Sequence, residues 1–404
     1  MYTKIRTSVG FLLVLLILMW SGCDLLSTDD DLEGEQQDNH AFSVRQTSDG
    51  GFILVGSTTD FEKAGAQVFL VKVDQDGMTE WSHTYGGDFT DIGYSVRQTS
   101  DGGYIIAGTI NRGSSLTASL LLLKVDADGT EEWTQTFGEV NVYNQDVYHE
   151  EGLCVEQLDD GGYIVAGVAR SALTTLLYAV RTDAAGEKVW SKLLASQEGM
   201  AGTSVLPTPD GGFVITGFTK TETIFPSDMY LVKLDSEGAE VWDHAYGSRS
   251  GREEAAWLDG TPDGGFIIAG QTDSTLNVDH YLVKTDSLGI EQWNRMVGNE
   301  NDDWSATIQQ TADGGYILAG TTFSSQTSSN DVVLRKLDNT GEEVWSRTYG
   351  QTGDEWCRSL HLTDNGGYIV VGITRDLGGV TYDIWLIRTD SQGSPVWDRT
   401  ISGE

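Results

Sequence analysis

Basic residues are scarce in this chain, and their scarcity excludes whole classes of partner. The 404 residues include 25 Lys and Arg against 61 Asp and Glu, a formal net charge of −36. Phosphates would be repelled, so neither a nucleic acid nor an anionic lipid surface is expected to bind. Disorder is excluded too, because 39% of the residues are hydrophobic, and 12 Trp, 15 Tyr and 12 Phe can fill a large core.

No hydrophobic run near the N-terminus is long enough to cross a membrane. The apolar run at residues 11–20 is about half the ~20 residues that a spanning helix needs. It follows Lys4 and Arg6 and precedes small residues, which is the order of an export signal. The Ser-Gly-Cys at 21–23 resembles the end of a bacterial lipobox. This resemblance implies a lipoprotein signal peptide at 1–22 and lipidation of Cys23, with plain secretion as the alternative.

Residues 23–39 are the next segment, and they hold like charges with few apolar side chains. Such a segment cannot pack, so we expect an acidic, flexible tether. Its composition resembles the surface-export signals of Bacteroidota lipoproteins. The resemblance implies a bacterial cell-envelope location, with the protein lipid-anchored at the outer membrane, and no other contact with the membrane.

From residue 40 onward one unit is repeated seven times. A Gly-Gly pair and a tryptophan recur in every repeat, and the tryptophans are 52, 57, 52, 51, 52 and 52 residues apart. The repeats span about 40–87, 88–139, 140–196, 197–248, 249–299, 300–351 and 352–404. The tryptophans are Trp81, Trp133, Trp190, Trp242, Trp293, Trp345 and Trp397.

Each repeat contains four short apolar runs, as at 94–99, 104–109, 120–126 and 132–137. Runs of this length, rich in Val, Ile, Tyr and Trp and bounded by Gly and Asp, are strands. Four strands per unit of about 50 residues favour a propeller over a β-helix, whose coils are shorter. The predicted fold is all-β: a seven-bladed β-propeller of four-stranded antiparallel blades over 40–404. Each blade is continuous in sequence, and closure is by packing.

The first strand of each repeat is expected to lie nearest the channel, because one of its positions is always small and strands that converge on the axis leave little room for side chains. That position holds Ala41, Gly93, Gly152, Gly202, Ala255, Ser305 and Cys357. The tryptophan strand then lies at the rim, where indoles fill the gaps between blades. The order Gly-Gly, Tyr-Ile-x-Ala-Gly, Leu-Val-Lys-x-Asp-x-x-Gly and Trp resembles a group of bacterial secreted and lipoprotein propellers and, more distantly, NHL and quinoprotein-type propellers. For function the resemblance implies little.

Motifs for chemistry are also lacking. The six histidines form no pair at metal-ligand spacing, and no HExxH or GxSxG occurs, so we expect no metal, no cofactor and no catalytic residue. Cys154 and Cys357 are expected to be buried thiols. Asp74 and Asp126 begin Asp-x-Asp-Gly sequences that are similar to a calcium loop, but they are interpreted as turn residues because five repeats lack the second acid. A basic residue two positions before each such turn is interpreted as an intrablade ion pair or a solvated position.

The repeats differ at the starts of their inner strands, and function is sought there. Five of these seven positions are acidic, among Asn39, Asp91, Glu150, Met200, Glu253, Asp303 and Glu355. In repeats 5 to 7 they are accompanied by Trp257, Trp304 and Trp356. Aromatic faces beside carboxylates suit a sugar, so Glu253, Trp257, Asp303, Trp304, Glu355 and Trp356 are the candidate ligand-binding residues. Packing of the tryptophans beneath loops is the alternative. The insertion in repeat 3, with Tyr143, Tyr148 and His149, is expected to overhang the same face.

The leading functional hypothesis is a non-enzymatic, monomeric envelope protein that binds a polysaccharide or a protein partner on one face. An enzyme is the rival: a glycoside hydrolase or lyase using carboxylates such as Asp303 and Glu355, within the ~5–10 Å that glycosidases need. A purely structural envelope component is the third alternative.

Overall fold

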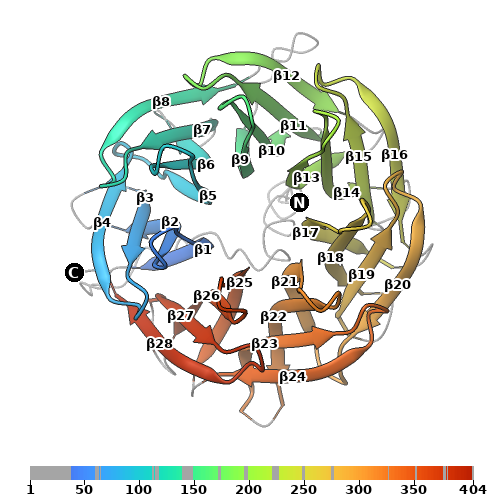
Figure 1. Ribbon diagram of the computed structural model, residues 1–404. Helices are drawn as coiled ribbons and strands as arrows, with labels where there is room; N and C mark the ends of the chain where they lie inside the picture. Colours follow the sequence, from blue (N-terminus) through green and yellow to red (C-terminus); the bar gives the residue numbers. More distant parts are fainter. Residues whose placement is uncertain are drawn as a thin grey trace, which may run out of the picture. The chain divides into compact units, whose positions relative to one another are not determined.

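Seven four-stranded antiparallel sheets surround a central axis in the computed structural model, which confirms the predicted β-propeller (Figure 1). The structure describes residues 38–402 apart from 60–62, 64, 112, 114–117, 139–148, 172–173, 195–198, 221–226, 248–250, 274–276, 326, 351–352, 376–378 and 380. The predicted signal peptide, Cys23, Tyr143 and Tyr148 therefore lie outside the described residues. No helix among the described residues is long and apolar enough to cross a membrane.

The four strands of each blade follow one another from the axis to the rim. The innermost strands are β1 (Asn39–Gln46), β5 (Ile92–Gln98), β9 (His149–Gln157), β13 (Met200–Pro207), β17 (Glu253–Gly260), β21 (Asp303–Gln310) and β25 (Asp354–Leu362). The second strands are β2 (Phe52–Thr59), β6 (Tyr104–Asn111), β10 (Tyr163–Arg170), β14 (Phe213–Lys220), β18 (Phe266–Thr272), β22 (Tyr316–Ser324) and β26 (Tyr368–Arg375). The third strands are β3 (Ala66–Val73), β7 (Ala118–Val125), β11 (Thr175–Thr182), β15 (Ser227–Leu234), β19 (Asp279–Thr285), β23 (Ser329–Leu337) and β27 (Asp383–Thr389). The outer strands are β4 (Thr79–Tyr85), β8 (Glu131–Phe137), β12 (Lys188–Leu194), β16 (Glu240–Tyr246), β20 (Glu291–Val297), β24 (Glu343–Tyr349) and β28 (Pro395–Ile401).

Blades close the ring by packing, as predicted. β28 pairs with β27 of its own blade, and β1 pairs with β2, so no strand is shared between the first and last repeats. Blades 1 and 7 are joined instead by backbone and side-chain contacts: the Asn39 amide donates to the Tyr382 carbonyl at 2.8 Å, and the Tyr382 amide donates to Asp38 Oδ1 at 2.7 Å.

The rim tryptophans form the same contact between every pair of neighbouring blades. Trp81 of blade 1 lies 5.9 Å, between ring centroids, from Tyr104, the aromatic residue that follows the Gly-Gly turn of blade 2. The other six tryptophans make the equivalent contact at 5.8–6.5 Å, and Trp397 closes the ring on Phe52. This contact confirms that the indoles fill the gaps between blades.

Each of blades 1 to 6 is also held together by an ion pair between a basic residue and the aspartate of its Gly-Gly turn, called the blade clamp here. Lys124, 2% exposed, lies 3.0 Å from the turn carboxylate of Asp101 and 3.0 Å from Glu132 on the outer strand. Blades 1 to 6 all pair the basic residue with the turn aspartate, at 2.6–3.0 Å. Blade 7 has Asn365 at this position, and its Arg388 donates to the Gln75 carbonyl of blade 1 instead. The intrablade ion-pair interpretation holds in six blades.

Two glycine positions explain how closely the inner strands approach their neighbours. A Cβ on Gly108 of β6 would lie 2.0 Å from the Ile92 carbonyl oxygen of β5, so only glycine fits there. A Cβ on Gly93 would lie 2.4 Å from Val55 of the neighbouring blade. The small position is therefore small because it packs against the preceding blade, whereas lack of room near the channel axis was the expected reason.

A β-bulge interrupts every inner strand just after this small position, as between Gly93 and Ser95. The extra residue breaks the alternation of faces, so residues on the two sides of the bulge follow different patterns of exposure. The bulged residues of adjacent blades contact one another: Phe42 and Tyr94 lie 5.2 Å apart, and the Arg358 guanidinium lies 5.8 Å from the Phe42 ring.

Candidate functional site at the channel mouth

The inner strands end at the Gly-Gly turns, and there they surround one mouth of the channel. The residue four positions before each turn Asp, or before Asn365 in blade 7, lies at this mouth, and these seven residues are called the mouth ring here. The mouth ring consists of Arg45, Arg97, Glu156, Leu206, Asp259, Gln309 and His361. Its members come from seven strands and include both charges, an amide, an imidazole and an aliphatic side chain.

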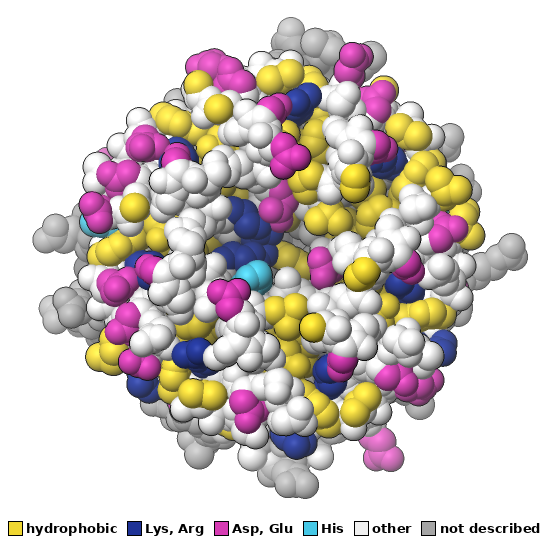
Figure 2. Space-filling view, viewed as in Figure 1, with side chains coloured by type: hydrophobic (Ala, Val, Ile, Leu, Met, Phe, Trp, Pro, Cys, Tyr) yellow, Lys and Arg dark blue, Asp and Glu magenta, His cyan; other side chains and the backbone are white. Residues whose placement is uncertain are grey.

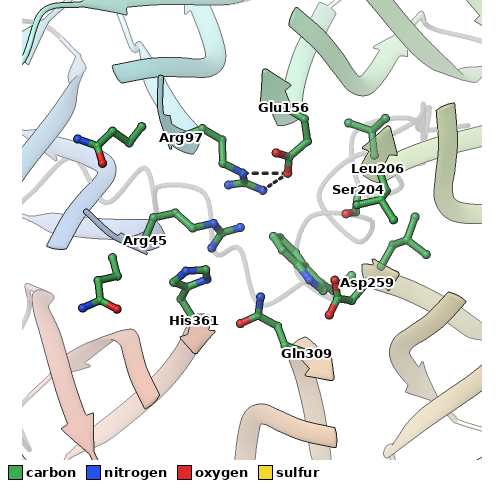
Figure 3. A pocket seen from close by; sticks show the side chains of 13 residues that line it. Arg45, Arg97, Glu156, Ser204, Leu206, Asp259, Gln309 and His361 are labelled. Carbon is green, nitrogen blue, oxygen red and sulfur yellow. Dashed lines mark hydrogen bonds and ion pairs between the residues drawn. The ribbon is translucent and has the colours of Figure 1, made fainter. Parts of the chain in front are cut away.

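A hollow of about 340 Å³ lies at this mouth, lined by the mouth ring together with Trp257, Ser204 and neighbouring residues (Figure 3). A second hollow of about 510 Å³ lies over the Gly-Gly turns of blades 1 and 2 and the ends of the inner strands of blades 2 and 3, and it shares Arg97, Gln98 and Glu156 with the first. The space-filling view shows basic side chains and a histidine in the central depression, with acidic side chains beside them and over the rest of the face (Figure 2). The mouth thus brings two arginines together with the carboxylates of Glu156 and Asp259 in an otherwise acidic protein.

Arg97 and Glu156 form the one ion pair that the structure records within the mouth ring. Arg97 Nη2 and Nε donate to Glu156 Oε1 at 2.5 and 2.8 Å, and the side chains are 13% and 24% exposed. Burial lowers the pKa of Arg97, but the Glu156 carboxylate outweighs it, so that the pKa is raised above its usual value. The Arg97 guanidinium is therefore charged and already bound to the Glu156 carboxylate.

Arg45 differs from Arg97 in having no carboxylate within ion-pair distance among the described residues. It is 6% exposed, its Nη1 donates to the Val44 carbonyl at 2.7 Å, and its guanidinium lies 5.1 Å from the centre of the Trp257 ring. Burial and the adjacent Arg97 lower the pKa of Arg45 to about 9, against the attraction of Glu156. Arg45 is therefore a cation at neutral pH, buried beside another cation.

His361 and Asp259 lie on opposite sides of the opening, His361 next to Arg45 and Asp259 across from it (Figure 3). Burial, together with Arg45 and Arg97, lowers the pKa of His361 to about 3, so the imidazole is neutral, and its Nδ1 is buried with no hydrogen-bond partner among the described residues. Asp259 accepts the amides of Gln310 and Gly260, both at 3.0 Å, and burial raises its pKa.

The described lining residues are suited to binding by charge and hydrogen bonding. The nearby thiol of Cys154 is buried, 1% exposed, and burial raises its pKa, so it is held as the neutral thiol rather than as a nucleophilic thiolate. Cys154 and Cys357 are both free and buried, which confirms their prediction as buried thiols. Asp74 Oδ1 accepts the amides of Asp76 and Met78 at 2.9 Å, the turn role that was expected for it.

The predicted acidic residues lie at the starts of the inner strands, away from the hollow. Glu253, Asp303 and Glu355 are 2%, 0% and 1% exposed. Thr272 and Thr374 donate to Glu253 and Glu355 at 3.1 and 3.0 Å, and Arg335 lies 3.0 Å from Asp303. Asp91, in the same column, accepts the amides of Gly87 and Asn111. These carboxylates link the inner strands to the loops and strands around them.

The predicted tryptophans are divided between two places. Trp304 of β21 and Trp356 of β25 lie together, with ring centroids 5.5 Å apart, and both are partly exposed. Trp257 is instead at the mouth, with Arg45 and Arg97 at 5.1 and 6.0 Å from its ring. His149, at the end of the insertion in repeat 3, begins β9 and lies 2.9 Å from Glu151.

The mouth ring was missed by the sequence reasoning, although a signal for it is present. When the repeats are aligned, the position four before the turn differs in charge, polarity and size, as does the position near the strand start that holds His40, Trp304 and Trp356. Only the first of these two positions lines the hollow. A position that packs in a repeated core keeps its character from blade to blade, so this variation marks a surface with another purpose.

Comparison with known proteins gives the fold and no family. No family model and no curated protein matches the chain. Among solved structures, puromycin hydrolase is similar with a TM-score of 0.55 and 15% identity over 90% of this chain, and the chain spans 54% of the length of that protein. The propeller domain of the Trilobed protease from Pyrococcus furiosus, described as having an open velcro topology, has a TM-score of 0.53, 10% identity and coverage of 90% and 96%. Sqt1 from Chaetomium thermophilum, bound to the N-terminus of the ribosomal protein L10, has a TM-score of 0.51 and 10% identity, and the match covers 89% of this chain and 87% of that protein. At these identities the likeness concerns the fold alone.

Proposed function

We propose that this protein is a non-enzymatic binding protein whose ligand site is the channel mouth. The supporting observation is the hollow of about 340 Å³, lined by side chains that differ from blade to blade within an otherwise repeated molecule. Sites for small ligands or for ligand groups start at about 300 Å³ and combine an apolar wall with a few polar groups. Trp257 and Leu206 supply the apolar wall here, and the other mouth-ring members supply the polar groups.

A binding role is favoured over catalysis by the state of the candidate groups. The acid pair that a glycoside hydrolase or lyase would use, Asp303 and Glu355, is buried and hydrogen-bonded. General acid–base work needs a group that reaches the substrate and titrates near the working pH. The enzyme hypothesis is tested by assaying the protein for turnover of a panel of glycans and peptides. Turnover that is lost on Asp303→Asn would support the enzyme hypothesis over our proposal.

The partner class follows from the chemistry of the surface. A protein or a polysaccharide whose inserted group is compact would reach the mouth, and Sqt1 gives one precedent of a similar fold holding a polypeptide segment. A partner with many negative charges is disfavoured by the net charge of −36. A purely structural envelope role is the outcome if no ligand is retained at the mouth.

A steric block tests the location of the site without knowledge of the ligand. Leu206 lines the hollow and is partly exposed, so Leu206→Trp should fill it. The matched control is Val241→Trp on the outer strand β16, where the side chain is 58% exposed. A thermal-shift and calorimetric screen of neutral, cationic and mono-anionic oligosaccharides, peptides and organic acids should give binders that Leu206→Trp loses and Val241→Trp keeps. Binders that are indifferent to Leu206→Trp would refute the location.

The Trp304–Trp356 pair is the basis of a second candidate site, for a glycan. Two partly exposed indoles 5.5 Å apart on neighbouring inner strands suit stacking against the faces of a sugar. Loss of glycan binding in the double variant Trp304→Ala and Trp356→Ala, with the fold intact, would support this site. Unchanged glycan binding, or loss of folding, would reject it.

We further propose that the propeller is held at the bacterial cell envelope through a lipid on Cys23. The supporting features are the signal-like residues 1–22 and the acidic segment that follows. Metabolic labelling with an alkyne fatty acid should mark the wild type and leave Cys23→Ser unlabelled and soluble. Retention of Cys23→Ser in the membrane fraction would contradict lipid anchoring.

A further inference from the structure

The mouth ring holds two arginines and two carboxylates, but only one of the arginines is paired with a carboxylate. Arg97 is engaged by Glu156 through two hydrogen bonds. Arg45 has no such partner among the described residues, although it is 6% exposed and lies near a second guanidinium. A buried ion that is not paired with a counter-ion is costly, and proteins tolerate such a local cost chiefly at functional sites.

The position of Arg45 leaves part of its hydrogen-bonding capacity open. A guanidinium carries five N–H donors, and the structure records one hydrogen bond from Arg45, Nη1 to the Val44 carbonyl. Contact with the Trp257 ring at 5.1 Å holds the planar group in one orientation at the hollow. Next to it, His361 Nδ1 is buried and also has no hydrogen-bond partner among the described residues. Two polar side chains from the adjacent blades 7 and 1 therefore lie together at the mouth, and both can form further hydrogen bonds.

Resting on the function proposed above, we propose that the mouth binds a single carboxylate group, with Arg45 as its anchor and His361 as a second hydrogen-bonding partner. A planar carboxylate matches one guanidinium edge through two parallel hydrogen bonds. A phosphate dianion fits less well, because Glu156 and Asp259 line the same hollow and would repel the second charge.

The group that carries the carboxylate is neutral or cationic overall. The net charge of −36 repels polyanions at long range, whereas a single carboxylate on a neutral carrier is admitted to a mouth where Arg45 and Arg97 lie together. Two sources share this chemistry: a small organic acid, and the C-terminal carboxylate of a polypeptide. The second hollow, which continues from Arg97 and Glu156 over the Gly-Gly turn of blade 2, would accommodate the chain that leads to such a terminus.

Paired probes that differ in one charge test the proposal by isothermal titration calorimetry. N-acetyl-alanine and its neutral N-methylamide represent the small acid, and the peptide acetyl-Gly-Ser-Gly-Ser-Ala with a free or an amidated C-terminus represents the polypeptide. Inorganic phosphate is the third kind of probe. We expect binding of at least one free carboxylate, loss of about tenfold or more on amidation, and weaker binding of phosphate. The stronger of the two carboxylate probes identifies the source.

The decisive variant is Arg45→Gln, and the chain offers a matched control. Arg347 on the rim strand β24 also donates to the preceding carbonyl, at 2.9 Å, and lies 5.6 Å from a tryptophan ring, that of Trp345. Arg347→Gln removes the same charge and the same stacking far from the mouth. Arg45→Gln should abolish carboxylate binding without lowering the melting temperature, and Arg45→Lys should retain part of it, since charge persists without the planar fork.

The outcomes separate this inference from the proposed function. If a ligand is blocked by Leu206→Trp but is indifferent to amidation and to Arg45→Gln, the carboxylate inference is wrong and the binding site stands. If carboxylate probes bind equally to the wild type and to Leu206→Trp, both are wrong. Absence of heat from every carboxylate probe at millimolar concentration, preference for phosphate, or equal losses in Arg45→Gln and Arg347→Gln would each overturn the inference.

Discussion

The rim and the channel mouth of this propeller differ in how far their residues repeat from blade to blade. At the rim, seven tryptophans make one contact seven times, each with the aromatic residue of the next blade. At the mouth, seven equivalent positions hold six residue types, and one of them is a buried arginine with no carboxylate partner among the described residues. Repetition therefore marks the residues that build the fold, and variation marks the residues that were free to acquire a role. The predictions below test that contrast.

The largest effect is expected where two backbones approach. Gly108→Ala would place a Cβ 2.0 Å from the Ile92 carbonyl oxygen, so β5 and β6 must separate, at a cost of about 3 kcal/mol or more in the free energy of unfolding. Gly87→Ala is the control, because no atom lies within 4 Å of its added Cβ, and it should change stability by less than about 0.5 kcal/mol. Urea unfolding of the two variants measures the difference, and equal stabilities would contradict the close approach.

The next effect compares tryptophans from the two regions. Trp133 packs on Tyr163, and its ring would lie 2.6 Å from a Cβ on Gly186, so Trp133→Ala should lose about 3 kcal/mol. Trp304→Ala, on an inner strand, should lose about 1 kcal/mol, because Trp304 lies outside this rim contact. Guanidinium unfolding curves of both variants provide the test. A larger loss for Trp304→Ala would reverse the contrast between rim and channel.

A smaller effect is expected at the blade clamps. Asp101→Asn removes the charge that faces Lys124 while keeping an oxygen for the turn, as Asn365 does naturally in blade 7. Glu132 still pairs with Lys124, and Asp101 is exposed, so the loss at pH 7 should be about 0.5–1 kcal/mol. Urea midpoints of Asp101→Asn and of the wild type measure it. No loss at all would mean that Glu132 alone satisfies Lys124.

The same clamps predict sensitivity to acid. Burial raises the pKa of Asp101, but hydrogen bonds from the Thr99 hydroxyl and the Gly103 amide, together with Lys124, outweigh burial and lower the pKa to about 2. The pKa values of Asp49, Asp263 and Asp313 are also lowered to about 2. At Asp49 and Asp263 burial is again the largest single effect, and it is again outweighed. Their charged forms are favoured in the folded state, so their stabilisation is complete above about pH 4 and is lost as the pH falls through about 2. Unfolding midpoints between pH 5 and pH 2 should decline less steeply for Asp101→Asn than for the wild type. Parallel curves would exclude the clamp as the cause.

Much of the fold was predictable, because the residues that determine it recur at the same position of every repeat. The spacing of the tryptophans predicted seven blades, and the uniformly small position of each repeat, such as Gly93, predicted the inner strand. The site was less accessible, for a physical reason. A bulge after Gly93 shifts the alternation of faces by one residue, so the period of two does not tell which inner-strand side chains reach the channel.

The acidic residues at the starts of the inner strands also could not be placed correctly from the sequence. Asp303 was expected at an open face, yet it is fully buried beside Arg335, a basic residue at a position that is apolar in the other six repeats. That pairing joins residues 32 positions apart on different strands, and no local pattern indicates it. Arg45 is the converse: an ordinary arginine in the sequence, whose unpaired state depends on what six other strands place around it.

The most direct test of the contrast between rim and mouth is the stability of Arg45→Leu, measured by urea unfolding at pH 7 against the wild type. Removing the guanidinium relieves its burial and its repulsion with Arg97, so we predict a free energy of unfolding equal to that of the wild type or up to about 1 kcal/mol higher. A loss of more than about 1 kcal/mol would show that Arg45 is retained for the fold, and would contradict the assignment of the mouth to binding.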